Sequence, residues 1–131
     1  LVCIVSDADG GDGTIEAVKR SIPVILHAHG DNISSWRNLL QIAANTSNPS
    51  RVVLTHQTPD KIDGMYNPGG FTDGDRAICF LLSLGVPIER IVLLGTRTDV
   101  VGKWSGNTNP EEKLVKLQWM AKILDIIGME Y

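Results

Sequence analysis

The sequence lacks a long hydrophobic run and an excess of positive charge. Its longest apolar runs have the length of a strand and fall short of a membrane span, and no signal-peptide pattern opens the chain. Lys and Arg number 12 against 15 Asp and Glu, and this net charge of −3 argues against a nucleic-acid partner bound through its phosphates. We therefore expect a cytoplasmic globular protein with neither a membrane nor a nucleic acid as partner.

Two further absences narrow the class of protein. Cys3 and Cys79 lie in apolar runs without CxxC spacing, so we expect reduced core residues rather than a disulfide. No GxGxxG motif follows the first apolar run, which argues against a dinucleotide-dependent dehydrogenase.

The length of 131 residues suits one core. We therefore expect a single α/β domain over 1–131. Because the chain starts at Leu1, inside an expected strand, we also expect it to be the C-terminal part of a longer protein.

Short β-branched runs at 1–6, 23–29, 51–56 and 90–96 alternate with stretches of helical period. This pattern predicts an α/β fold with a mainly parallel sheet. The clearest helix follows Asn109, the expected cap, and Pro110, and its expected buried stripe comprises Leu114, Leu117, Ala121 and Leu124.

A polar cluster directly follows each expected strand: SDADGGDG, HAHGDN, HQTPD and GTRTD. The carboxyl ends of parallel strands meet at one edge of a sheet, where the ligands of open α/β sheets bind. The sequence therefore predicts that all four clusters lie along that edge.

Asp7 and Asp9 carry like charges one residue apart, and a divalent cation would relieve their repulsion. Oxygen ligands of this kind favour Mg²⁺ over Zn²⁺. In the alternative interpretation both carboxylates only cap the following turn, and Asp12 fits either interpretation.

A second acidic motif is NPGGFTDGDRA. Gly69 and Gly70 permit a close backbone approach, and Thr72 has the position of the N-cap of a helix that continues through Leu82. Asp73 and Asp75 are candidates for a metal ligand and a base, or for acids that complement the helix dipole. Arg76, one turn after Thr72, is placed to grip phosphate oxygens.

Four polar residues end the second expected strand: His27, His29, Asp31 and Asn32. They are candidate partners for a phosphate or a heterocycle. Zinc is an alternative for the two histidines, although no third soft ligand has suitable spacing. Asp31 is also a candidate helix cap, and His56 and Gln57 are similar candidates after the third strand.

In this order, SDADG, HAHGDN, Gln57-Thr58, NPGGFTDGDRA, LLGT with GKWS, and KLVKLQWMAKIL resemble the archaeal type of 6-hydroxymethyl-7,8-dihydropterin diphosphokinase. That family is related to the thiamine pyrophosphokinases. Their DxD pair and TDxxK helix start correspond here to Asp7, Asp9, Thr72, Asp73 and Arg76. The resemblance implies a three-layer Rossmann-like fold similar to the thiamine pyrophosphokinase catalytic domain.

The resemblance also implies an activity: Mg²⁺-dependent transfer of diphosphate from ATP to the hydroxymethyl oxygen of a reduced pterin. AMP is released, and the pathway is tetrahydromethanopterin or folate synthesis. We expect Asp7, Asp9 and Asp73 to bind the metal and Asp73, Asp75 and Arg76 to be catalytic. Asn67, Asn32 and Gln57 are candidates for the pterin edge, and Lys103 or Lys113 for the triphosphate. The sequence leaves a homodimer open.

The chain departs from the family at one segment. Residues 95–98 read GTRT where the family usually has a GMDF-like segment, and Asp99 is the candidate replacement for the missing acid. This departure bears on the identity of the acceptor more than on metal binding, because the other acidic motifs are intact. Another hydroxylated acceptor such as thiamine therefore stays an alternative.

Two other classes stay open as well. The segment IVSDADGG resembles the first motif of haloacid-dehalogenase-type phosphatases, although Gly11 replaces their Thr or Val and HAHGDN is left unexplained. A non-catalytic nucleotide-binding domain is the third alternative, and the altered GTRT segment is its only support.

Overall fold

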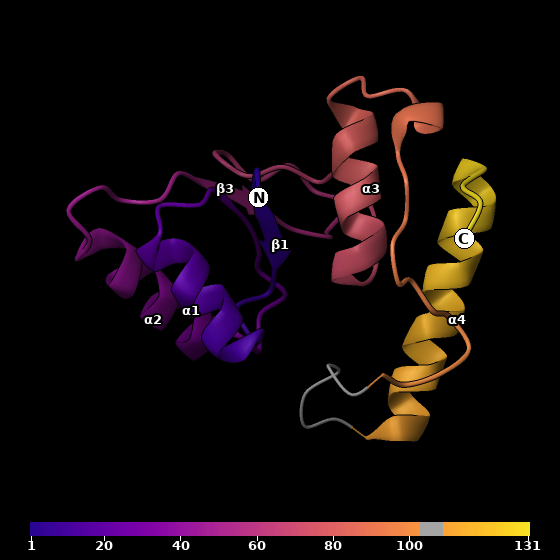
Figure 1. The fold of residues 1–131 in the computed structure, drawn as a ribbon, viewed down its shortest axis with the longest axis horizontal. Coiled ribbons are helices and arrows are strands. Elements are labelled where there is room, and N and C mark those ends of the chain that lie inside the picture. Colours follow the sequence, from indigo (N-terminus) through magenta and orange to yellow (C-terminus); the bar gives the residue numbers. More distant parts are fainter. Residues whose placement is uncertain (103–108) are drawn as a thin grey trace. The chain divides into compact units, whose positions relative to one another are not determined.

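The computed structural model describes residues 1–102 and 109–131. The chain forms two compact units, unit 1 (Leu1–Asn67) and unit 2 (Pro68–Tyr131) (Figure 1). No helix among the described residues combines the length and the apolar character needed to span a membrane.

Unit 1 alternates strands with helices, in the order β1 (Ile4–Ser6), α1 (Gly11–Lys19), β2 (Val24–His27), α2 (Ile33–Ala44) and β3 (Val52–Thr55). The strands form one parallel sheet in the order β1-β2-β3. All three strands therefore end at the same edge. The α/β class and the parallel sheet expected from the alternating pattern are confirmed.

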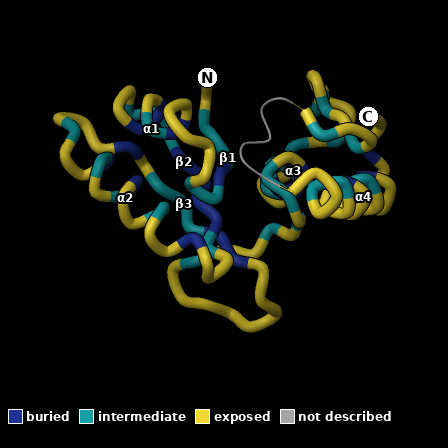
Figure 2. The backbone as a smooth tube through the Cα atoms, turned by 90° about the horizontal axis from the view of Figure 1, so that it is seen from below, coloured by how far each residue is buried: buried dark blue, intermediate teal, exposed yellow. Residues whose placement is uncertain are grey.

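The core of unit 1 lies between the sheet and the pair α1 and α2. The alternating side chains of Val24 and Leu26 on β2 point into it and join Val18, Leu39 and Ala43 from the two helices. β2 is buried along its whole length because it is the central strand (Figure 2). A strand buried in this way is a rigid support for the loops that follow it.

Unit 2 contains α3 (Asp73–Ser83), the short 3₁₀ helix η1 (Ile88–Arg90) and α4 (Pro110–Ile127). Its core gathers Ile78 of α3 with Leu117, Met120 and Leu124 of α4. The expected cap of α4 is confirmed, because Asn109 Oδ1 accepts from the Glu111 backbone N–H at 3.0 Å. Leu117 and Leu124 are buried as expected, whereas Leu114 and Ala121 are only half-buried.

The prediction of a strand at 90–96 is wrong. The structure has η1 over its first residue and no strand over the rest of it. The segment keeps the alternation of a strand, since Ile91 and Leu93 pack on the apolar cluster of unit 2 while Val92 and Leu94 are 76% and 89% exposed. A strand requires a hydrogen-bonded neighbouring strand, and the described residues of unit 2 offer none. The GTRTD cluster accordingly does not follow a strand.

Both cysteines are free thiols, as expected. Cys79 is buried in α3, and Cys3 is half-buried just before β1.

Candidate active site

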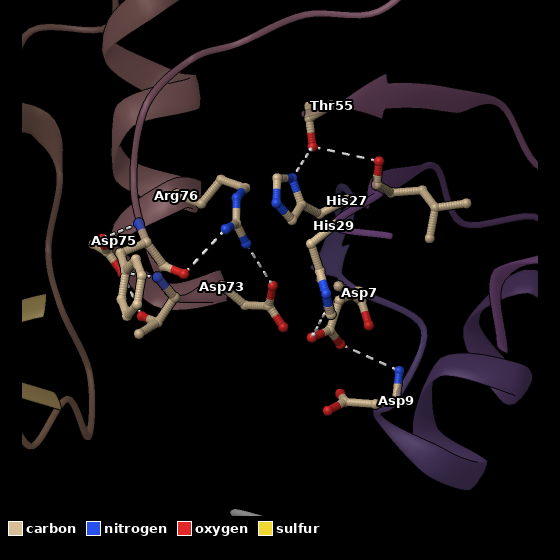
Figure 3. A network of polar contacts seen from close by, with 12 residues as sticks. Asp7, Asp9, His27, His29, Thr55, Asp73, Asp75 and Arg76 are labelled. Atoms are coloured by element: carbon tan, nitrogen blue, oxygen red, sulfur yellow. Dashed lines mark hydrogen bonds and ion pairs between the residues drawn. The ribbon is translucent and has the colours of Figure 1, made fainter. Parts of the chain in front are cut away.

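The acidic turn, residues 7–9, follows β1 directly (Figure 3). Its central residue, Ala8, has φ 73°, in the left-handed region that non-glycine residues rarely adopt. Ser6 Oγ accepts from the Ala8 backbone N–H at 3.0 Å, and Asp7 Oδ1 accepts from the Asp9 backbone N–H at 3.3 Å. These bonds hold the turn at the end of a rigid strand.

The Asp7 carboxylate faces a histidine. His29 Nε2 lies 3.3 Å from Asp7 Oδ2, and the other ring nitrogen of His29 contacts Asp31. Burial raises the pKa of Asp7, but hydrogen bonds with Asp9 and His29 and the charge of His29 together lower it below its ordinary value. Asp7 is therefore ionised at neutral pH, the state that metal binding requires.

His27 is buried at the end of β2 and is held by β3. Its Nδ1 lies 3.1 Å from Thr55 Oγ1, and that hydroxyl donates to the Leu26 carbonyl at 3.3 Å. Both contacts are hydrogen bonds at the same time when Nδ1 carries a proton. The rings of His27 and His29 lie 5.8 Å apart, so the two predicted histidines share one region of the sheet edge.

Asn32 joins the loops that follow β1 and β2. Its Nδ2 donates to the Asp7 carbonyl at 2.7 Å and to the His27 carbonyl at 2.8 Å, and its Oδ1 accepts from the His29 N–H at 3.3 Å. Asn32, not Asp31, occupies the N-cap position of α2, so the expectation that Asp31 caps this helix is wrong by one residue. Asp31 is instead exposed and paired with His29.

The loop after β3 is organised around Thr58. Its hydroxyl lies 3.0 Å from His56 Nδ1, and its carbonyl accepts from Asn67 Nδ2 at 2.9 Å. His56 is buried, whereas the neighbouring Gln57 is exposed.

In unit 2, the start of α3 is built as the motif predicts. Thr72 is the N-cap, and Asp75, three residues later, completes a capping box. The Asp75 carboxylate accepts from the Thr72 N–H at 2.7 Å and from the Phe71 N–H at 2.6 Å, and it also contacts the Thr72 hydroxyl. Asp75 is fully buried, so this geometry favours the capping interpretation of Asp75 over a catalytic one.

Asp73 and Arg76 form an ion pair on the first turn of α3, with 3.0 Å between Asp73 Oδ1 and Arg76 Nη1. Arg76 also donates to the Phe71 carbonyl at 3.1 Å, so its guanidinium is fixed in place (Figure 3). Gly70 is required here: at φ 87° a Cβ would lie 2.5 Å from Arg76 Cα. The glycine therefore lets the loop pass against the helix start, as the motif predicts for close approach.

The remaining candidates are more scattered. Gly69 has φ 88° beside Gly70, Asp12 lies in the first turn of α1, and Lys113 lies in the first turn of α4. Lys103 falls outside the described residues. Asp99, the candidate replacement for the family's acid, is exposed and bound by Arg97 through two hydrogen bonds of 2.7 Å, which lower its pKa.

The structure thus shows a cluster of candidate residues in each unit. Unit 1 gathers Asp7, Asp9, His27, His29, Asp31 and Asn32 at the edge where β1 and β2 end. Unit 2 gathers Gly70, Thr72, Asp73, Asp75 and Arg76 at the start of α3. That Asp73 shares a metal with Asp7 and Asp9 stays a prediction.

Two functional residues were missed by sequence reasoning. Ser6 supports the acidic turn, and Thr55 holds His27. Both are hydroxyl residues at the last position of an apolar strand, and that position is the signal that would have found them.

Comparison with known proteins supports the resemblance drawn from the motifs. Neither a protein-family profile nor a solved structure matches the chain. The chain is 34% identical over 132 residues to a Methanothermobacter thermautotrophicus protein and 33% identical over 129 residues to one from Pyrococcus furiosus. Each alignment covers 93% of this chain, and 53% and 52% of the two relatives, respectively.

A third relative, from Methanocaldococcus jannaschii, is 37% identical over 97 residues, which cover 70% of this chain and 37% of that protein. The chain spans about half the length of the first two relatives. All three are named 6-hydroxymethyl-7,8-dihydropterin pyrophosphokinase, so the resemblance predicted from the motifs is confirmed.

Proposed function

We propose that the chain carries the catalytic residues for transfer of diphosphate from ATP to 6-hydroxymethyl-7,8-dihydropterin, with release of AMP, in tetrahydromethanopterin or folate synthesis. The observation that carries the proposal is the acidic turn. It presents two carboxylates at the edge of a parallel sheet, in a chain similar to three archaeal pyrophosphokinases.

The donor chemistry of the acidic turn fits Mg²⁺. Asp7 is ionised, and both side chains offer the oxygen ligands that this ion takes. We assign Asp7 and Asp9 of unit 1 and Asp73 of unit 2 as its ligands. When bound, Mg²⁺ offsets the charge that develops on the transferred diphosphate and aligns it.

The other residues have binding roles in this proposal. Gly69, Gly70 and Arg76 hold phosphate oxygens at the start of α3, where the helix dipole favours an anion, and Thr72 shapes this start as its N-cap. His27 at the end of β2 binds the heterocycle in this proposal, and His29 contacts both Asp7 and Asp31. The assignments of Gln57 and Asn67 to the pterin edge and of Lys103 to the triphosphate are part of the same proposal.

The geometry separates the two acids of α3. Asp75 is fully buried and its oxygens accept hydrogen bonds from the backbone, whereas Asp73 is 37% exposed beside Arg76. We therefore place Asp73 on the metal and give Asp75 the task of shaping the helix start.

A three-layer Rossmann-like fold of the thiamine pyrophosphokinase type is part of the same proposal. It is supported by three parallel strands with α1 and α2 packed against them. A single domain over 1–131, a homodimer and a cytoplasmic location stay predictions.

The test is AMP formation by the full chain supplied with Mg²⁺, ATP and the pterin. AMP that requires both the pterin and a metal that EDTA removes is the expected result. No AMP in the complete mixture would contradict the proposal.

A second acceptor is favoured by one observation, the pairing of Asp99 with Arg97. In this pair Arg97 binds Asp99, the candidate replacement for the acid that the altered segment 95–98 lacks. The assay therefore includes thiamine in place of the pterin, and AMP in that arm alone would identify a thiamine-type acceptor.

A further inference from the structure

Ala8 adopts a backbone conformation that its side chain disfavours. A left-handed φ of 73° at a non-glycine residue persists only where neighbouring contacts impose it. Here the residue lies between the two carboxylates assigned to the metal, so whatever imposes this conformation also aims both ligands.

The contacts that impose it come from three side chains of unit 1. Ser6 Oγ and Asp7 Oδ1 accept from the backbone N–H groups of Ala8 and Asp9, at 3.0 and 3.3 Å. Both are local contacts, within two residues along the chain. The third contact comes from Asn32, which donates to the Asp7 carbonyl at 2.7 Å, the shortest of the three.

Asn32 also anchors this contact to the rigid part of the sheet. Its second N–H donates to the carbonyl of His27, the last residue of the fully buried strand β2, at 2.8 Å. Its oxygen accepts from the His29 N–H at 3.3 Å, and the side chain is buried. Both N–H groups of the amide are used on backbone carbonyls, so they are not available to a ligand.

We propose that Asn32 is the positioning residue of the metal site: it clamps the acidic turn to the end of β2 and so keeps Asp7 and Asp9 in a conformation ready for a divalent cation. This inference rests on the proposed function. It replaces the expectation that Asn32 contacts the pterin. Partners that orient metal ligands in this way affect metal affinity about 10- to 100-fold.

The test measures Mn²⁺ binding to the full chain without nucleotide, which would itself chelate the ion, from the loss of the free-Mn²⁺ paramagnetic resonance signal. Asn32→Ser shortens the side chain so that it no longer spans both carbonyls. We expect its Mn²⁺ affinity to fall at least about tenfold. The control is Asn45→Ser, at the exposed opposite end of α2, which should bind Mn²⁺ as the wild type does.

A double variant separates positioning from general damage. Ala8→Gly removes the cost of the left-handed conformation. If Asn32 acts by imposing that conformation, Ala8→Gly should restore the Mn²⁺ affinity of Asn32→Ser to within about threefold of wild type. If Asn32→Ser does not fold, Asn32→Gln, which displaces the same amide by one methylene group, replaces it in both measurements.

Equal Mn²⁺ affinity in wild type and Asn32→Ser would overturn the inference and leave the proposed function standing. A loss of affinity that Ala8→Gly does not reduce would overturn it too, because Asn32 would then act by another route. If the wild type binds no Mn²⁺, the metal site itself is wrong and the proposed function fails with it.

Discussion

The two units each contain an Asp-x-Asp motif, and they use the same spacing differently. In unit 1, Asp7 and Asp9 lie in a turn, where the Asp7 carboxylate accepts from the Asp9 backbone N–H and also contacts His29. In unit 2, Asp73 and Asp75 lie on the first turn of a helix, which directs Asp75 into the backbone and Asp73 toward Arg76. The same spacing therefore gives the two carboxylates different partners in a turn and on the first turn of a helix.

The largest expected effect is on turnover and concerns the proposed metal ligands of both units. Asp7→Asn and Asp73→Asn should each lower the rate of AMP formation by at least about 100-fold, because each removes a charge from the proposed metal site. Circular dichroism should show an intact fold in both variants. Rates close to wild type in both would refute the metal assignment.

The next effect tests how closely the loop packs against α3. Gly70→Ala should lower the free energy of unfolding by about 3 kcal/mol, because the Cβ would collide with the Arg76 backbone at a positive φ. Gly85→Ala is the matched control: its φ of 80° is similar, but nothing lies within 4 Å of its Cβ. In urea denaturation, Gly85→Ala should lose only about 1 kcal/mol of unfolding free energy, which is the conformational cost alone. Equal losses would mean that the contact is absent.

Asp75→Ala should primarily reduce stability, in contrast to Asp7→Asn. It removes the acceptor for the Phe71 and Thr72 N–H groups at the buried helix start, so we expect a loss of about 2 kcal/mol in urea denaturation. Glu112→Ala, at the exposed third position of α4, is the control and should cost less than about 0.5 kcal/mol. A stable Asp75→Ala with no AMP formation would instead restore the catalytic assignment of Asp75.

The smallest effect concerns Cys79, which lies one turn after Asp75. Burial and the charge of Asp75 raise the pKa of the Cys79 thiol. The folded chain then keeps this proton to a higher pH than the unfolded chain does, so unfolding releases a proton and the stability contributed by the thiol is lost as pH rises above about 8.5. Wild type should therefore lose melting temperature more steeply than Cys79→Ala above that pH. Parallel curves would show that the thiol is not perturbed.

Sequence reasoning recovered the parts that depend on local pattern. The parallel α/β class of unit 1, the caps Thr72 and Asn109 and the glycine requirement at Gly70 all follow from short-range rules of periodicity, capping and backbone sterics. The strand expected at 90–96 failed because a strand also needs a neighbour. Its apolar alternation is present, but a hydrogen-bonded partner is a tertiary feature.

By itself the sequence determined which residue types stand at the ends of the strands and at the start of α3, because a strand or a helix start is marked locally. Only the tertiary structure decided which partners each residue contacts. It shows that Asn32 donates to the Asp7 carbonyl, that Asp75 accepts from the Phe71 backbone N–H, and that Ala8 has a left-handed φ between two acids. These features depend on hydrogen bonds, and Asn32 shows the reason clearly: its partner, the Asp7 carbonyl, lies 25 residues away, and only folding brings the two together.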